Sequence, residues 1–111
     1  MQNSASFEAA VERLRDRFRA EAGSRLDDFL GHMGSVESGK DQTLALEGMI
    51  NQVHRVRGVA KTFGFAELGQ LAEDLENQLD ADRKSMLPQE AVGAAKPRID
   101  SFVAMMREIA I

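Results

Sequence analysis

Residues 46–79 of the chain read LEGMINQVHRVRGVAKTFGFAELGQLAEDLENQL, and this stretch decides the fold. It contains two apolar stripes with steps of three and four residues, which place the apolar side chains on one face of an α-helix. Gly64 separates the stripes, so we expect two antiparallel helices joined by a short turn. The stripes are Leu46, Met49, Ile50, Val53, Val56, Ala60 and Phe63, and then Phe65, Leu68, Leu71, Ala72, Leu75 and Leu79.

Toward the amino terminus, a further stripe with the same spacing predicts a long first helix. Residues 31–40 collect glycines and serines, which favour turns, so we expect them to connect the first helix to the second. Asp41 or Thr43 is available as the amino-terminal cap of the second helix. The stripe of the first helix consists of Phe7, Val11, Leu14, Phe18, Ala22, Leu26, Phe29 and Met33.

Toward the carboxyl terminus, a polar connection over residues 80–85 precedes Pro88, which suits a helix start. Pro97 falls within the segment that the stripe of this fourth helix spans, and its ring would press on the carbonyl of Gly93. We therefore expect a kink or a late helix start there. The members of the stripe are Val92, Ala95, Ile99, Phe102, Met106 and Ile109.

The fold class follows from these stripes, because no segment alternates apolar and polar residues as a strand would. The sequence predicts an all-α protein, an antiparallel up-down four-helix bundle, with room for a short extra turn before Phe7. A length of 111 residues suits one hydrophobic core, so we expect a single domain over residues 1–111.

Composition excludes several classes of function. The net charge of −4 opposes binding to nucleic acid, and the chain has no apolar run of about 18 residues that a membrane span would need. Cysteine is absent, which fits a reducing compartment, and we expect a cytoplasmic location. Two histidines without cysteine make a metal site improbable, and without a phosphate-binding glycine loop we expect neither ATP binding nor autokinase activity.

His54, Arg57, Gly58 and Lys61 fall on one face of the second helix. A neutral, exposed imidazole can attack a phosphoryl group, and the two cations can neutralise its oxygens. Gly58 costs about 1 kcal/mol relative to alanine inside a helix, but its bare backbone would let a phosphoryl group or a partner approach. By itself the cluster also fits an ordinary surface histidine between two arginines. The other histidine, His32, is interpreted as a stabilising cation at the end of the first helix.

The longer stretch from His54 to Glu76 resembles the signature of the histidine-containing phosphotransfer (HPt) family. The match reads His-x-hydrophobic-basic-Gly-x-Ala-x-x-Phe-Gly, followed by Leu, Leu and Leu-Glu at the spacings of the family. The matching residues are His54, Val56, Arg57, Gly58, Ala60, Phe63, Gly64, Leu68, Leu71, Leu75 and Glu76.

This resemblance implies roles for individual residues. His54 would be phosphorylated, Arg57 would lie beside the phosphoryl group, and Gly58 would keep access open. Glu76 falls where the family places glutamine or glutamate, and we expect its carboxylate to accept a hydrogen bond from one ring nitrogen, leaving the other free. The chain departs from the family at Arg57, where lysine is more frequent. For Lys61, a phosphate contact and a solvated surface lysine remain equally good interpretations.

The resemblance also implies partners. His54 would receive the phosphoryl group from a receiver-domain aspartate or a sensor or hybrid histidine kinase, and would pass it to another response-regulator receiver domain. The chain would need no cofactor, since the receiver supplies Mg²⁺, and an apolar rim near Phe65 and Gly69 would bind the receiver. Monomer is the expected state.

Two other functions stay open. The chain could be the input phosphotransfer domain of a chemotaxis-type kinase, an interpretation that Glu76 favours. Met1 and a number of helices sufficient for a closed bundle instead favour a free-standing protein. Alternatively, it is a helical interaction module in which His54 is never phosphorylated.

Overall fold

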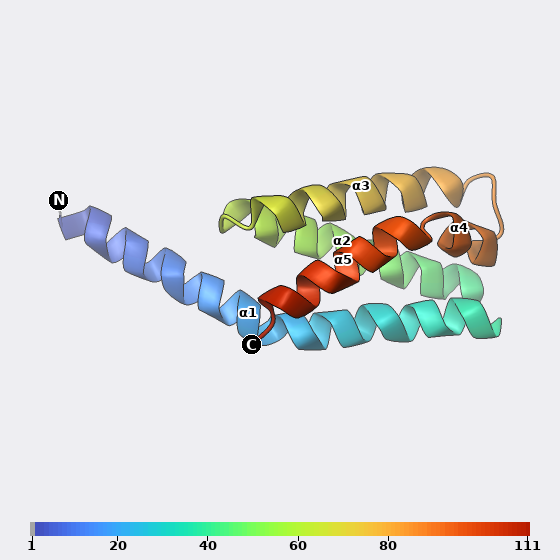
Figure 1. Ribbon diagram of the computed structural model, residues 1–111, viewed down its shortest axis with the longest axis horizontal. Coiled ribbons are helices and arrows are strands. Elements are labelled where there is room, and N and C mark those ends of the chain that lie inside the picture. Colours follow the sequence, from blue (N-terminus) through green and yellow to red (C-terminus); the bar gives the residue numbers. More distant parts are fainter. Residues whose placement is uncertain (1) are drawn as a thin grey trace.

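The computed structural model describes residues 2–111, with side chains from residue 5 onward, and this part of the chain is helical without strands. Its helices are α1 (Gln2–Ser38), α2 (Gln42–Thr62), α3 (Ala66–Asp82), α4 (Pro88–Ala94) and α5 (Lys96–Ile109). They form an antiparallel up-down bundle in which α4 and α5 together take the fourth position (Figure 1). The predicted all-α bundle is therefore confirmed. No helix among residues 2–111 combines the length and the apolar character that crossing a membrane requires.

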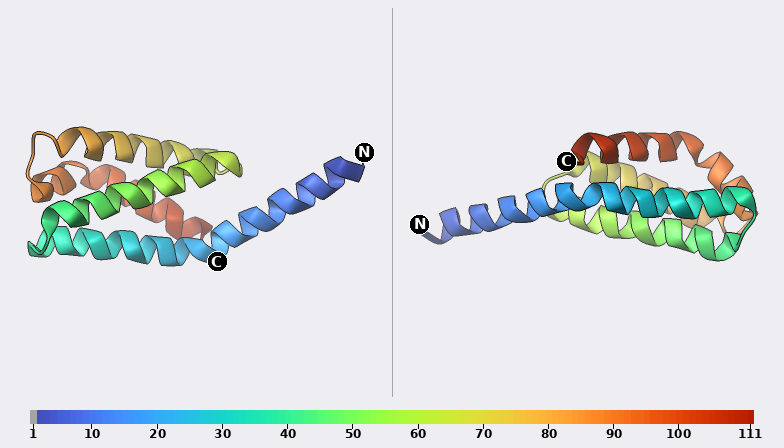
Figure 2. Two further views of the ribbon diagram at one scale, coloured as in Figure 1. Left: turned by 180° about the vertical axis from the view of Figure 1, so that it is seen from behind. Right: turned by 90° about the horizontal axis from the view of Figure 1, so that it is seen from below.

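The core lies between the inner faces of the helices, and Figure 2 shows the bundle from two further sides. Phe29 of α1 and Phe102 of α5 join these two neighbouring helices, with ring centroids 5.3 Å apart. Such an aromatic pair stabilises a fold beyond the area that it buries. The largest fully buried side chains are Phe29, Phe102, Met49, Leu68, Leu75, Leu79, Ile99, Met106, Val36, Val53 and Val56.

The turn between α2 and α3 is as short as predicted. Gly64 adopts φ of 83°, a left-handed conformation that glycine tolerates without steric cost. The backbone N–H of Phe65 donates to the carbonyl of Ala60 at 2.8 Å, which closes the end of α2 as in a Schellman motif. The turn thereby holds α3 antiparallel to α2.

The prediction of a loop over residues 31–40 is wrong, because α1 continues to Ser38 and only residues 39–41 connect it to α2. Val36 is fully buried and extends the apolar stripe, so core packing outweighs the turn preference of the local residues. The Ser35 and Ser38 hydroxyl groups donate to carbonyls of the preceding helical turn instead of opening it.

The predicted side-chain cap of α2 is also wrong. Asp41 occupies the residue before the helix, but it has φ of 49° and its side chain makes no capping hydrogen bond. Thr43 lies within α2. Instead, the Gln42 side chain donates to the carbonyl of Val36 at 2.9 Å, which satisfies an acceptor at the end of α1.

The carboxyl-terminal region breaks near Pro97, as predicted, but into two helices rather than one bent helix. α4 begins at Pro88 and ends at Ala94, and α5 has Pro97 in its first turn, where proline removes no helical hydrogen bond. Buried residues of the predicted stripe lie on both helices. The preceding connection is shorter than predicted, since α3 continues to Asp82.

The amino-terminal part of the predicted core stripe is not in the core. Phe7 is 70% exposed and Leu14 is 42% exposed, and burial begins at Phe18. With about 1.5 Å of rise per residue, the 37 residues of α1 span about 55 Å, against about 32 Å for the 21 residues of α2. α1 therefore extends past the end of the bundle (Figures 1 and 2). It is continuous from Gln2, so the extra turn before Phe7 is part of α1, and Met1 lies outside the described residues.

Candidate functional site

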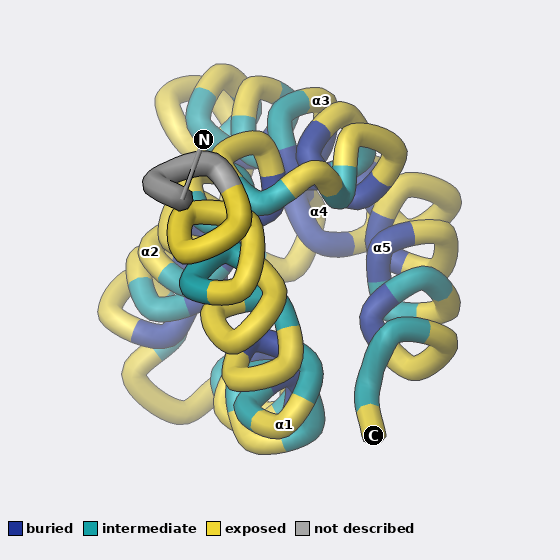
Figure 3. Tube along the Cα trace, turned by 90° about the vertical axis from the view of Figure 1, so that its left-hand side faces the viewer, coloured by how far each residue is buried: buried dark blue, intermediate teal, exposed yellow. Residues whose placement is uncertain are grey.

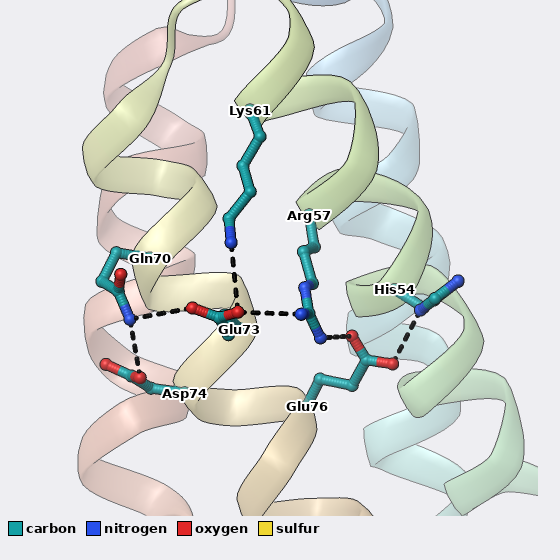
Figure 4. A network of polar contacts seen from close by, with 7 residues as sticks. All are labelled: His54, Arg57, Lys61, Gln70, Glu73, Asp74 and Glu76. Carbon is teal, nitrogen blue, oxygen red and sulfur yellow. Dashed lines mark hydrogen bonds and ion pairs between the residues drawn. The ribbon is translucent and has the colours of Figure 1, made fainter.

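The face of α2 that carries His54, Arg57 and Lys61 lies against α3, whose Glu73 and Glu76 meet these side chains (Figure 4). The short turn at Gly64 fixes this pairing, since it brings the two helices side by side in opposite directions. The predicted residues thus converge on one cluster of polar contacts.

His54 and Glu76 form the central contact. Nδ1 of His54 lies 2.7 Å from Oε2 of Glu76, while the second ring nitrogen points away from the cluster (Figure 4). The Glu76 side chain is only 15% exposed and the His54 side chain is 69% exposed. An ionised carboxylate can only accept a hydrogen bond, so the neutral imidazole that fits here carries its hydrogen on Nδ1. The unprotonated Nε2 is then the nitrogen that faces solvent.

Arg57 joins both carboxylates of α3. Its Nη1 donates to Oε1 of Glu76 at 3.1 Å, and its Nη2 donates to Oε1 of Glu73 at 2.8 Å. Because the same carboxylate of Glu76 accepts from His54 and Arg57, the arginine helps to fix its orientation. Arg57 therefore contacts the imidazole's partner, rather than the imidazole itself.

Lys61 donates to Oε1 of Glu73 at 3.1 Å. It lies seven residues after His54, which is about 10 Å along the helix axis. The stem of Lys61 also covers Gly69, where a Cβ atom would lie 2.7 Å from Cγ of the lysine. Gly69 is buried, so it allows α3 to approach α2 rather than offering a surface at the predicted rim.

Sequence reasoning missed Glu73, which binds Arg57 and Lys61. A signal was present, because Glu73 and Glu76 are three residues apart and share one face of a helix. Hydrogen bonding from Lys61 keeps the pKa of Glu73 below its usual value. Since the folded-state pKa is lowered, this carboxylate stabilises the fold at neutral pH, and the contribution is lost as the pH falls through that lowered pKa.

Gly58 is exposed on α2, and a Cβ atom there would meet no described atom within 4 Å. Packing between the described residues therefore does not require glycine at this position. Contacts within the bundle therefore do not explain why a glycine, which destabilises a helix, occupies this position.

His32 has a structural position, but not the one predicted. α1 continues for six residues beyond it, so the ring is not in the last helical turn. It packs over Gly48 of α2, where a Cβ atom would lie 2.6 Å from Cε1 of His32. Among residues 2–111, no group of three histidine, cysteine or acidic side chains is placed to hold a metal ion.

Comparison with known proteins agrees with this geometry. A family model described as the Hpt domain matches residues 13–109, which include every residue of the polar cluster. No curated protein and no solved structure gives a significant match. The match spans most of the 111 residues, and it covers the helices that carry His54 and Glu76. The chain therefore belongs to the Hpt domain family, whose members carry out histidine phosphotransfer in two-component phosphorelays and interact with kinases and receiver domains.

Proposed function

We propose that His54 accepts a phosphoryl group from a receiver-domain aspartate or a histidine kinase and donates it to the aspartate of another response-regulator receiver domain. The observation that carries this proposal is the difference between the two ring nitrogens. Nδ1 is held at 2.7 Å by Glu76, whereas the side chain as a whole is largely exposed, so Nε2 is available to a partner.

In the forward step, the lone pair of Nε2 attacks the phosphorus atom, the P–O bond of the donor acyl phosphate breaks, and the aspartate leaves as a carboxylate. The ring keeps its hydrogen on Nδ1 and becomes positively charged. Glu76 stabilises that charge, in the way that a buried carboxylate stabilises a catalytic imidazolium. Phosphorylation at Nε2 also keeps the new negative charge away from the carboxylates of α3.

Arg57 is proposed as a positioning residue, because it binds the carboxylate that orients His54. Lys61 is assigned to anchoring α3 through Glu73, with a direct phosphate contact as the alternative. The chain contributes no cofactor in this scheme. Mg²⁺ and the acidic pocket belong to the receiver, so transfer depends mainly on positioning and neutralisation of charge.

The test is phosphoryl transfer from a panel of labelled receivers and kinases, followed over seconds to minutes. Acid-labile, alkali-stable label should appear on the chain and move onto a second receiver. An input domain of a chemotaxis-type kinase, which Glu76 favours, would accept label from an ATP-loaded kinase domain and from no receiver. A helical interaction module would remain unlabelled with every donor, and this result would overturn the proposal.

Glu76→Ala is expected to slow phosphorylation of His54 by about 10- to 100-fold, the equivalent of one charge-assisted hydrogen bond. Glu76→Gln should be intermediate, because the amide oxygen still accepts from Nδ1 but carries no charge. Initial rates with one phosphorylated donor measure the effect. Asp74→Ala is the control, since Asp74 lies on α3 and contacts Gln70 rather than His54. A wild-type rate for Glu76→Ala would exclude the proposed role.

Gly58→Ala is expected to raise the free energy of unfolding by about 1 kcal/mol, because alanine favours the helix and the site has room for a Cβ atom. If the bare backbone serves a partner, the same change should slow phosphotransfer. Urea unfolding and transfer rates measure the two effects. Gly31→Ala is the matched control, being an exposed helical glycine with equal room, and it should alter stability alone. Equal transfer rates in both variants would remove the access role of Gly58.

A further inference from the structure

The part of α1 that precedes Phe18, here called the projecting segment (residues 5–17), keeps an apolar stripe outside the bundle. Phe7 and Leu14 are exposed, and Val11 between them is only partly covered. Figure 3 views the molecule from this end and shows that the coloured turns of α1 nearest the viewer are mostly exposed. A row of apolar side chains at helical spacing on a free helix indicates a surface that binds another helix.

The stripe leads into a hollow between α1 and α2. Its volume is about 210 Å³, and it is lined by Leu14, Arg17, Phe18, Glu21, Arg25, Val59 and Phe63. The hollow is open to solvent, so a side chain from outside can enter it. Phe7 of the same chain lies about 16 Å before Phe18 along α1 and cannot reach the hollow. Phe7 of a second copy of the chain can reach this hollow.

Charge distinguishes the two ways of pairing such segments. If two copies pair antiparallel with Val11 opposite Leu14, Phe7 of each copy meets the hollow beside Phe18 of the other. The same arrangement puts Glu8 of each copy beside Arg15 of the other, giving two opposite-charge contacts by symmetry. A parallel pair would place Phe7 beside Phe7, would leave both hollows empty and would form neither contact.

We propose that two copies of this chain associate through antiparallel pairing of their projecting segments, with Phe7 of each in the hollow of the other. One pair of three-turn helices is smaller than a standard interface of about 1,600 Å², so the dimer is weak and reversible. A weak dimer differs from the monomer that the resemblance to the family implies. The proposed dimer goes beyond the proposed function. It leaves His54 accessible, because Phe63 in the hollow lies half a helical turn away from His54 around α2.

The test is sedimentation equilibrium of the whole chain from about 10 μM to about 1 mM, the range in which small interfaces associate. The mean mass should rise from 12.2 kDa toward twice that value. Phe7→Ala should weaken association at least tenfold, whereas Leu44→Ala, which removes an equally exposed side chain at 69%, should not. A mass of 12.2 kDa throughout would overturn the proposal. So would equal weakening by both variants, which indicates unspecific contact.

The orientation has its own test. Glu8→Arg and Arg15→Glu should each weaken the dimer by about threefold to tenfold, because each creates two like-charge contacts. The combined variant should regain affinity, since the opposite-charge contacts are restored in reverse. Circular dichroism checks that the helices are intact, because Arg15 also lies over the ring of Phe65. A combined variant as weak as the single ones would overturn the antiparallel pairing.

Discussion

His54→Gln is expected to accept no phosphoryl group from any donor that labels the wild-type chain. Glutamine occupies similar space and keeps a polar group near Glu76, but its amide nitrogen has no available lone pair with which to attack phosphorus. Because the His54 side chain is exposed and is not part of the hydrophobic core, the fold should be unaffected. The measurement is the amount of acid-labile label after incubation with a competent donor.

His32→Gln is the matched control, because the sequence contains two histidines in all. His32 packs between α1 and α2 over Gly48, so its replacement should change stability slightly and leave phosphorylation at the wild-type level. Label that persists in His54→Gln and disappears in His32→Gln would show that His32 is the phosphorylated residue, which would contradict the proposal. Label that persists in both would point to a residue other than histidine.

Phe29→Ala is expected to lower the free energy of unfolding by about 4 kcal/mol, within the range for removing a buried aromatic ring. Phe29 is 1% exposed and contacts Phe102, so its loss leaves a cavity where α1 meets α5. Domains of this size have total stabilities of about 5–15 kcal/mol, and the melting temperature should fall by about 15–25 °C. Thermal and urea unfolding provide the measurement.

Phe7→Ala is the same substitution at an exposed position of the same helix. At concentrations low enough to keep the chain monomeric, it should change stability by less than about 0.5 kcal/mol. Similar losses in the two variants would mean that the projecting segment is packed in solution, against the structure described above. A small loss for Phe29→Ala would mean that the α1–α5 contact contributes little.

The sequence predicted those features of the fold that follow from the backbone conformation of a single residue. Gly64 gives the turn because only its left-handed conformation closes the end of α2, and Pro97 interrupts the last helix because of its ring. The helical residues 31–38 were not predictable in this way. Their glycines and serines favour turns, and only the burial of Val36 by other helices reverses that preference.

Burial of the first helix was mispredicted for a related reason. An apolar stripe shows which face of a helix avoids water, but not whether another helix is long enough to cover it. At the site, the positions of His54, Arg57 and Lys61 on one face follow from helical spacing alone. Their contact with Glu73 depends on how far α3 is shifted along α2, which no local pattern of the sequence specifies.

Gly69 contributes to this alignment, together with the short turn at Gly64. A Cβ atom at this position would lie 2.7 Å from the Lys61 side chain, and Gly69 is the sole glycine of α3, so one alignment of the two helices places bare backbone under the lysine. Sliding α3 by one helical turn would bring a bulkier residue into the same gap. The close approach of the two helices at Gly69 therefore supports the alignment between the imidazole and the carboxylate. Losing any single ion pair should loosen the side chains around His54 without misaligning the helices that carry them.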